Sequence, residues 1–364
     1  MELTESRAKK ELKNFFKADL HPPMIIIGSG ISCTIDGRFG MDALKKHLTA
    51  EIPKSAPEKN QEEWELVKTA LTHGSDLENA LNNVTSPSLI STIVETTGKF
   101  IASLDEDYFT QILSGEKIWK PIDLMGKILS GRTAANPSII IVTTNYDNLI
   151  EYALEAKSIP YNLGFYGGVI RNYDWNVSEK IFQKHEPTSF QKKKASELKI
   201  KPHFVILKVH GSLNTFLYKA KIVELESMKW HPKEGFERMI VTPGMNKYEK
   251  VLSYREELIA EFDKKLKIHQ GCFLLLGYGL NDNHIDKKIQ EKLKKGARGL
   301  LLTKGSNDRI DALINNSENL WLVCSDSKDG ISGTKIFNKS YSNALFIPNK
   351  NWWDTSDFTK EILG

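Results

Sequence analysis

Four short apolar runs stand out along the chain, and each ends in a cluster of small or polar residues. They lie at 24–27 (MIII), 139–142 (IIIV), 204–209 (FVILKV) and 273–276 (FLLL). Continuous apolar runs of this length are typical of strands that are buried on both faces of a parallel sheet. Because stretches with helical periodicity separate the runs, the pattern predicts an α/β protein built on a mostly parallel sheet.

The helical stretches also divide the chain. A helix is predicted over 2–20, ended by a pair of prolines, and 58–133 holds several helical stretches with little strand signal. The segments 160–200 and 220–250 are rich in loop-forming, aromatic and charged residues and are expected to be irregular. The predicted division is 1–57 as the start of an α/β domain, 58–133 as a helical insertion, 134–300 as the rest of that domain, and 301–364 as a C-terminal segment of strands and a helix that is a candidate interface.

Composition and charge are those of an ordinary globular protein, with 40% hydrophobic and 26% charged residues. A length of 364 residues fits one large α/β domain with additions, or two domains. The 50 Lys and Arg against 46 Asp and Glu leave a net charge of only +4, with no long block of one sign. This balance argues against direct contact with nucleic acid.

Two further features bear on location. The longest apolar stretches are too short to span a bilayer, and segment 1–16 has the pattern of a charged amphipathic helix rather than a signal peptide. Cys33, Cys272 and Cys324 lie far apart, so no C-x-x-C pair exists and neither a zinc ribbon nor a disulfide framework is expected. Because isolated thiols are typical of a reducing compartment, we expect a cytoplasmic protein without membrane contact.

The polar clusters that end the four apolar runs are GSGIS, TTNYD, HGS and GYGLND. In an open parallel sheet, ligands bind in the crevice beyond the carboxyl ends of the strands, so these clusters are expected to converge there. GSGIS alone favours an ordinary strand-to-helix turn, because Gly28 and Gly30 match two glycines of the dinucleotide fingerprint but Cys33 takes the place of the third. Four clusters at one edge are stronger evidence of a site than any single one.

Each of the later clusters has a structural interpretation beside a functional one. Asn145 or Asp147 would serve as a helix cap, although their turn holds more polar groups than one cap needs. His210 is either a satisfied residue at a strand edge or a group suited to proton transfer near neutral pH. Asn281 or Asp282 would either contact a ligand or cap the next helix.

In their order and spacing, GSGIS, TTNYD, HGS and GYGLND resemble the sirtuin family, in particular its bacterial sirtuin-like branch associated with anti-phage defence. The resemblance spans roughly Ile25 to Ile285 and implies a doubly wound, Rossmann-type NAD-binding domain with a smaller inserted module. It implies that Asn145 orients the ribose and the attacking water, and that His210 acts as a base on a ribose hydroxyl or on water. It further implies that GSGIS holds the pyrophosphate and that Asp147 contacts the nicotinamide carboxamide. The residues expected to bind NAD are Gly28, Ser29, Gly30, Ile31, Ser32, Thr144, Asp147, Gly277, Gly279 and Asn281.

The chain also departs from the protein deacetylases of that family. Their zinc ribbon of paired cysteines cannot be built from three scattered cysteines, and their Pro-Asp-Phe-Arg segment is replaced by CTIDGRFGMDAL. Both departures disfavour an acyl-lysine groove and favour water as the acceptor. The resulting prediction is an NAD glycohydrolase that needs no metal, takes NAD as its substrate and releases nicotinamide and ADP-ribose. It would deplete NAD in anti-phage defence.

Control and alternatives follow from the same resemblance. Because constitutive NAD hydrolysis is toxic, activation by self-assembly into a homo-oligomer or by a partner such as a HerA-like ATPase is expected, with 160–200 as a candidate lid. The main alternative is a nucleotide-sensing regulatory subunit of a larger defence complex without activity of its own. The chain has no Walker A motif. A nuclease and a protein deacylase have weaker support.

Overall fold

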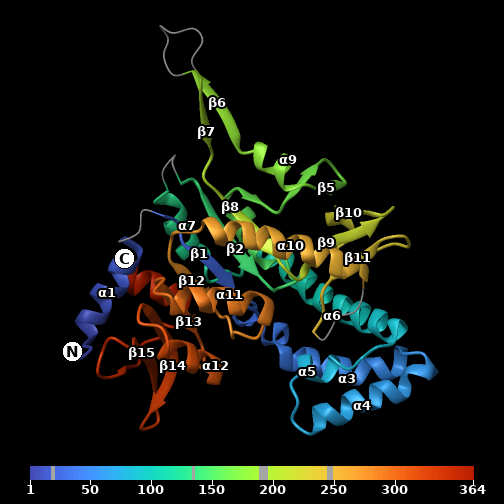
Figure 1. Cartoon of the computed structure of the whole chain (residues 1–364), viewed down its shortest axis with the longest axis horizontal. Helices are drawn as coiled ribbons and strands as arrows, with labels where there is room; N and C mark the ends of the chain where they lie inside the picture. The colour runs from blue at the N-terminus through green and yellow to red at the C-terminus, as the bar shows by residue number, and fades with distance from the viewer. Residues whose placement is uncertain (18–20, 133–135, 188–195, 244–248) are drawn as a thin grey trace.

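The centre of the molecule is a nine-stranded sheet flanked by helices (Figure 1). The structure is a computed structural model that describes residues 1–17, 21–132, 136–187, 196–243 and 249–364. In spatial order the sheet consists of β16 (Leu345–Pro348), β15 (Ile331–Phe337), β14 (Leu320–Lys328), β13 (Gly299–Thr303), β12 (Phe273–Leu276), β1 (Met24–Ile27), β2 (Ser138–Thr143), β8 (His203–Lys208) and β3 (Tyr161–Asn162).

The sheet is mostly parallel, as the apolar runs predict. Strands β14 through β3 pair in parallel, and β15 and β16 add an antiparallel edge. The four apolar runs of the sequence form the adjacent strands β12, β1, β2 and β8. From β1 the chain builds β2 and β8 on one side and later returns to build β12, β13 and β14 on the other. This reversal beside β1 is the topological switch point of a doubly wound fold, so the predicted fold class is confirmed.

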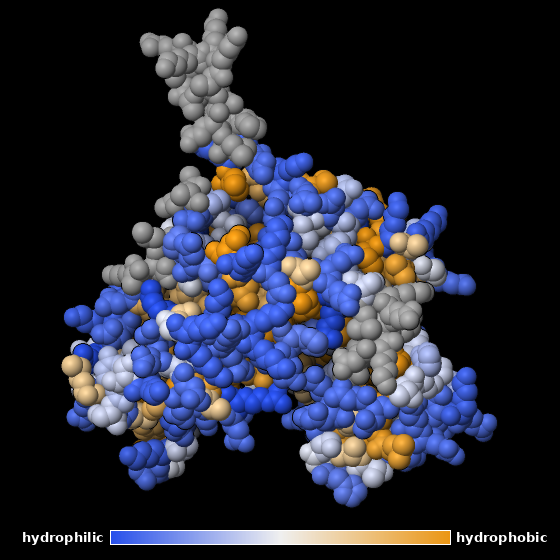
Figure 2. All heavy atoms as spheres, viewed as in Figure 1, coloured by the Kyte–Doolittle hydropathy of each residue, from blue (hydrophilic) through white to orange (hydrophobic). Residues whose placement is uncertain are grey.

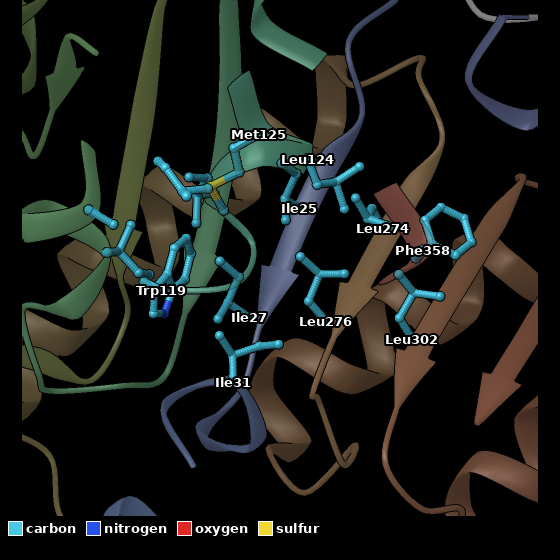
Figure 3. Close-up of a cluster of buried hydrophobic side chains, with 14 of the residues drawn as sticks. Ile25, Ile27, Ile31, Trp119, Leu124, Met125, Leu274, Leu276, Leu302 and Phe358 are labelled. Carbon is cyan, nitrogen blue, oxygen red and sulfur yellow. The ribbon is translucent and has the colours of Figure 1, made fainter. Parts of the chain in front are cut away.

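Helices cover both faces of the sheet, which is why its strands are apolar throughout. In β1, Ile25 and Ile27 point into one buried cluster and Met24 and Ile26 into another. The first cluster, shown in Figure 3, is completed by α1 (Glu5–Lys17), α6 (Pro87–Leu113), α7 (Ile122–Ser130), α8 (Leu149–Ala156) and α13 (Thr355–Phe358), which the π-helical turn η4 (Thr359–Leu363) follows. The second cluster is completed by α10 (Glu249–Ile268), α11 (Asn283–Lys294) and α12 (Asp308–Asn315).

The helical segment after β1 is shared between two cores. A separate apolar cluster joins helices α3 (Met41–Ser55), α4 (Gln61–Thr72) and α5 (Leu77–Leu81) to the first turns of α6. Further along α6, Ile101 and Leu104 pack into the main core. The long α6 therefore anchors a small helical module, α3 to α5, to the sheet. Short helices connect these elements: α2 (Ser29–Ser32), η1 (Gly37–Phe39) and η2 (Glu58–Asn60).

Strands in the segments expected to be irregular join β9 (Gly211–Tyr218), which lies between those segments, in a second sheet. It is antiparallel and has the order β11 (Glu237–Ile240), β9, β10 (Lys221–Glu224), β5 (Arg171–Tyr173) and β4 (Phe165–Gly167). The same region holds α9 (Trp175–Lys180) and η3 (Glu226–Met228), and the paired strands β6 (Gln183–Pro187) and β7 (Ser196–Ile200) project away from the body (Figure 1). Strands this short, with little alternation, carry a weak sequence signal.

The face of the molecule in Figure 2 is mainly hydrophilic, with scattered apolar side chains. Among the described residues, no helix has the length and apolar character that crossing a membrane requires.

Candidate active site

A cavity of about 570 Å³ lies at the carboxyl ends of β1, β2, β8 and β12. This volume is in the range of sites for cofactors and other small molecules. All four polar clusters contribute to its wall, through Gly28 and Ser29, through Thr144 to Asp147, through His210, and through Gly277 to Asp282 with the exception of Leu280. The convergence expected of the strand ends is therefore present in the structure.

The first and last clusters touch each other through their backbones. A Cβ atom on Gly28 would lie 2.5 Å from the carbonyl oxygen of Gly277, and one on Gly277, whose φ is +53°, would lie 2.6 Å from the Ile31 amide nitrogen. The amide of Gly30 donates to the same Gly277 carbonyl (3.2 Å), and that of Ile31 donates to Gly28 (3.1 Å). Glycine is thus required here for the close approach of two turns.

Only part of the GSGIS turn faces the cavity. Gly28 and Ser29 face the cavity, whereas Gly30, Ile31 and Ser32 are not part of its wall. Since the amides of Gly30 and Ile31 already donate within the protein, they hold the turn in shape. The pyrophosphate role expected of the whole turn stays a prediction.

The TTNYD turn is tied to GSGIS by a buried hydrogen-bond network. The Asn145 side-chain amide donates to the Gly28 carbonyl (3.2 Å) and to the Ser32 hydroxyl (3.0 Å), which in turn donates to Asp147 Oδ2 (2.9 Å). Asn145 Oδ1 is buried and has no hydrogen-bond partner among the described residues. Because a buried acceptor without a partner is costly, this oxygen is available for a ligand at the cavity wall.

Asp147 is nearly inaccessible to solvent, and burial raises the pKa of its carboxyl group to about 6 despite the nearby Lys208 ammonium. Its other oxygen accepts from the Leu149 amide (3.3 Å), at the start of α8. The capping interpretation therefore applies weakly to Asp147, while Asn145 makes no bond to the helix. Behind this turn, Lys208 Nζ donates to the Asp147 carbonyl (2.5 Å) and pairs with Glu151 (2.7 Å).

His210 follows β8 and lies against Asp282. Its Nε2 atom is 2.5 Å from Asp282 Oδ2, and the side chain is only 19% exposed. The other oxygen of Asp282 accepts from the amides of His284 (2.8 Å) and Ile285 (3.3 Å), so Asp282 is also the cap of α11. The capping interpretation of Asp282 is therefore confirmed, and a ligand contact stays a prediction for a residue that also lines the cavity. Asn281 lines the cavity as well, and its Oδ1 accepts from Arg309 (3.0 Å).

Sequence reasoning missed several residues of the wall. Glu78 from α5, Arg255 from α10 and Arg309 from α12 all line the cavity. Burial and the neighbouring Asp282 carboxylate raise the pKa of Glu78. Each of these residues lies in an ordinary amphipathic helix with no motif around it, so the sequence holds no signal for them. In contrast, none of the described residues of 160–200 lines the cavity, and the lid role of that segment stays a prediction.

Within the described ranges, no group of three or more His, Cys, Asp or Glu side chains is arranged to hold a metal ion. Cys33 is half-buried, Cys272 and Cys324 are buried, and no disulfide joins any two of them.

Residues 139–320, half of the chain, match the SIR2-like domain. The chain belongs to the SIR2-like family. The matched residues include the TTNYD, HGS and GYGLND turns, which are three of the four turns that line the cavity. SIR2-like domains bind NAD, and the family includes NAD-dependent enzymes, so the function of this SIR2-like protein is related to NAD. No curated protein matches the sequence.

Proposed function

We propose that this SIR2-like protein hydrolyses the bond between nicotinamide and ribose in NAD. The single observation that supports this proposal is the meeting of Asn145 and His210 in one cavity at the switch point of the sheet. Asn145 presents an unpartnered buried oxygen there, and His210 presents a ring that can accept a proton. An acceptor and a base are the groups that a water attack at the ribose carbon requires.

In the proposed reaction, the bond from the ribose C1′ to the nicotinamide nitrogen breaks. Nicotinamide leaves as a neutral molecule with the electron pair, and the oxygen of one water forms the new bond to C1′. The proton of that water passes to His210 and then to solvent, so the products are nicotinamide, ADP-ribose and one proton. Asn145 Oδ1 would accept a hydrogen bond from the ribose or the water, and Asp147 would face the carboxamide. Their buried network holds them in place before substrate arrives, which lowers the entropic cost of the reaction.

We further propose that this activity serves anti-phage defence by depleting NAD, and that self-assembly or a partner such as a HerA-like ATPase controls it. Uncontrolled loss of NAD would be toxic to the cell, so an enzyme with this activity needs to be restrained until it is required. The helical module supplies a physical route for such control: its α5 carries Glu78 into the cavity wall, yet its apolar cluster is separate from the main core.

The test is to incubate the purified protein with NAD, with and without a candidate partner, and to follow nicotinamide and ADP-ribose by chromatography. Asn145→Ala and His210→Ala should each lower turnover by about 100-fold or more. Matched controls are Asn338→Ala and His203→Gln, which change a buried asparagine and a buried histidine outside the cavity wall and should retain turnover.

Undiminished turnover in both cavity variants would remove the site assignment. Tight NAD binding without NAD loss under every condition would support a nucleotide-sensing subunit instead. Conversion of an acetyl-lysine peptide would support a deacylase.

A further inference from the structure

We propose that Asp282 is a positioning residue that holds the His210 ring and determines which of its nitrogens accepts the proton. The inference rests on the proposed function, because it assigns the base of that reaction. His210 Nε2 and Asp282 Oδ2 are 2.5 Å apart, and both side chains line the cavity. Both atoms are shielded from solvent and have no hydrogen-bond partner among the described residues, and each lies within ion-pair distance of the other.

The carboxylate is rigidly placed by the helix that follows it. Asp282 Oδ1 accepts two backbone hydrogen bonds at the start of the twelve-residue α11, which leaves Oδ2 to face the histidine. Burial disfavours the charged form, but His210, the His284 amide and Arg255 outweigh it and hold the pKa of Asp282 well below its usual range. The Asp282 carboxyl group is therefore an anion at neutral pH. It can only accept a hydrogen bond, and so requires a ring nitrogen that carries hydrogen.

This arrangement assigns the histidine tautomer. With a carboxylate at Nε2, the neutral ring carries its hydrogen on Nε2 and its lone pair on Nδ1. Nδ1 makes no hydrogen bond to the residues that the structure describes, so it is the nitrogen that would take the proton of the attacking water. The imidazolium that forms lies next to the anion, whose charge stabilises it until the proton leaves to solvent.

Other charged and titratable groups surround this pair. Glu78 faces it from α5, Arg255 from α10 and His284 from α11, and the Tyr146 ring lies 6.4 Å from the His210 ring. The Asp282 carboxylate is the group in direct contact with the ring nitrogen. The inference therefore concerns a specific contact rather than the general charge of the cavity.

The dual role of Asp282 allows its two functions to be separated. Asparagine caps helices as well as aspartate does, so Asp282→Asn keeps the cap but presents an amide to Nε2. An amide hydrogen directed at Nε2 favours the opposite tautomer, with the proton on Nδ1. We expect kcat to fall by about 100-fold or more, with KM changed by less than about threefold and an unchanged melting temperature.

Two further variants complete the test. Asp282→Glu keeps the carboxylate but disturbs the cap, so it should lose stability and still retain more activity than Asp282→Asn. Asp174→Asn is the matched control: Asp174 caps α9 through two backbone amides, as Asp282 caps α11, and lies outside the cavity wall. It should leave the melting temperature unchanged, which tests whether asparagine replaces aspartate as a helix cap without loss of stability.

A second readout does not depend on turnover. The ¹⁵N chemical shifts of the His210 ring in the full-length protein should show hydrogen on Nε2 in the wild type and on Nδ1 in Asp282→Asn. A wild-type ring with its hydrogen on Nδ1, or a kcat in Asp282→Asn within about threefold of wild type, would show that Asp282 is only a cap. If the wild-type protein does not hydrolyse NAD, the proposed function fails, and the ring shifts still decide the tautomer.

Discussion

Asp286 shows how a single buried side chain couples this fold to pH. It lies one turn into α11, where its Oδ1 accepts from the Tyr278 hydroxyl (2.7 Å) and its Oδ2 is buried without a partner among the described residues. Burial, with the nearby Asp282 charge, raises the pKa of the Asp286 carboxyl group to about 7. The folded protein thus binds this proton well above the ordinary value of 3.8.

The consequence for stability has a definite sign. Between pH 4 and 7 the folded state holds a proton at Asp286 that the unfolded chain has lost, so the contribution of this group falls as pH rises. We expect the free energy of unfolding of the wild type, minus that of Asp286→Asn, to decrease by about 2–4 kcal/mol across this window. Urea unfolding at several pH values measures it. A difference that stays constant, or that grows with pH, would contradict the buried, protonated carboxyl group.

At the level of elements, the helical module of α3 to α5 forms part of the cavity wall and has an apolar core of its own. Trp64 is fully buried at the centre of that core, among residues from α3, α4, α5 and the start of α6. The loop before α5 and the helix itself then carry Asp76, Leu77 and Glu78 to the cavity. Packing around Trp64 therefore determines the position of one side of the site.

Replacing this residue tests that dependence. Trp64→Ala should destabilise the module by about 3–5 kcal/mol, because it removes a large buried side chain and leaves a cavity. Hydrogen exchange should become faster in α4 and α5 while β1 and β2 stay protected, since their apolar clusters are separate. Leu66→Ala is the control on the same helix; this side chain is 71% exposed, and the change should stay within about 0.5 kcal/mol. Equal loss of protection throughout the sheet would show that the two cores unfold as one.

At the level of the whole molecule, segments from opposite ends of the chain close the main core together. In Figure 1 both chain ends lie near α1, the N-terminus at its start and the C-terminus near its other end. Phe358 of α13 is fully buried and packs edge-on against Phe16 of α1, with 6.1 Å between ring centres. Lys9 pairs with Glu361 (3.8 Å), and the Leu3 amide donates to Asn343 (2.8 Å). The C-terminal segment thus covers the same face of the sheet as α6 and α7.

Phe358→Ala should therefore act globally rather than locally. We expect the free energy of unfolding to fall by about 3–5 kcal/mol, with the sheet and α1 losing stability together. Chemical denaturation followed by circular dichroism measures the loss, and hydrogen exchange reports on α1. Ile331→Ala, at a side chain that is 46% exposed on β15, is the control and should have little effect. Intact stability in Phe358→Ala would mean that this segment packs on a sheet that is already complete.

Part of the site follows from local pattern. Apolar runs reveal buried strands, and in a parallel sheet all carboxyl ends lie at one edge, so Asn145, His210 and the two glycine turns could be brought together without coordinates. The same reasoning could not find Arg255 or Glu78, because an amphipathic helix shows which face is buried and not what that face meets. It also treated most strands of the second, antiparallel sheet as loops, since β4, β5, β10 and β11 are short and weakly patterned.

The sequence by itself thus determined the α/β class, the order of the buried parallel strands along the chain and the chemical character of the turn after each, because burial and periodicity are visible in short segments of sequence. Only the tertiary structure decided which oxygen of Asp282 lies against His210 and that the α3-to-α5 module forms a wall of the cavity. It also showed that the turns at Gly28 and Gly277 approach so closely that neither position has room for a side chain. Such contacts join residues far apart in the chain, and their distances depend on how whole elements pack.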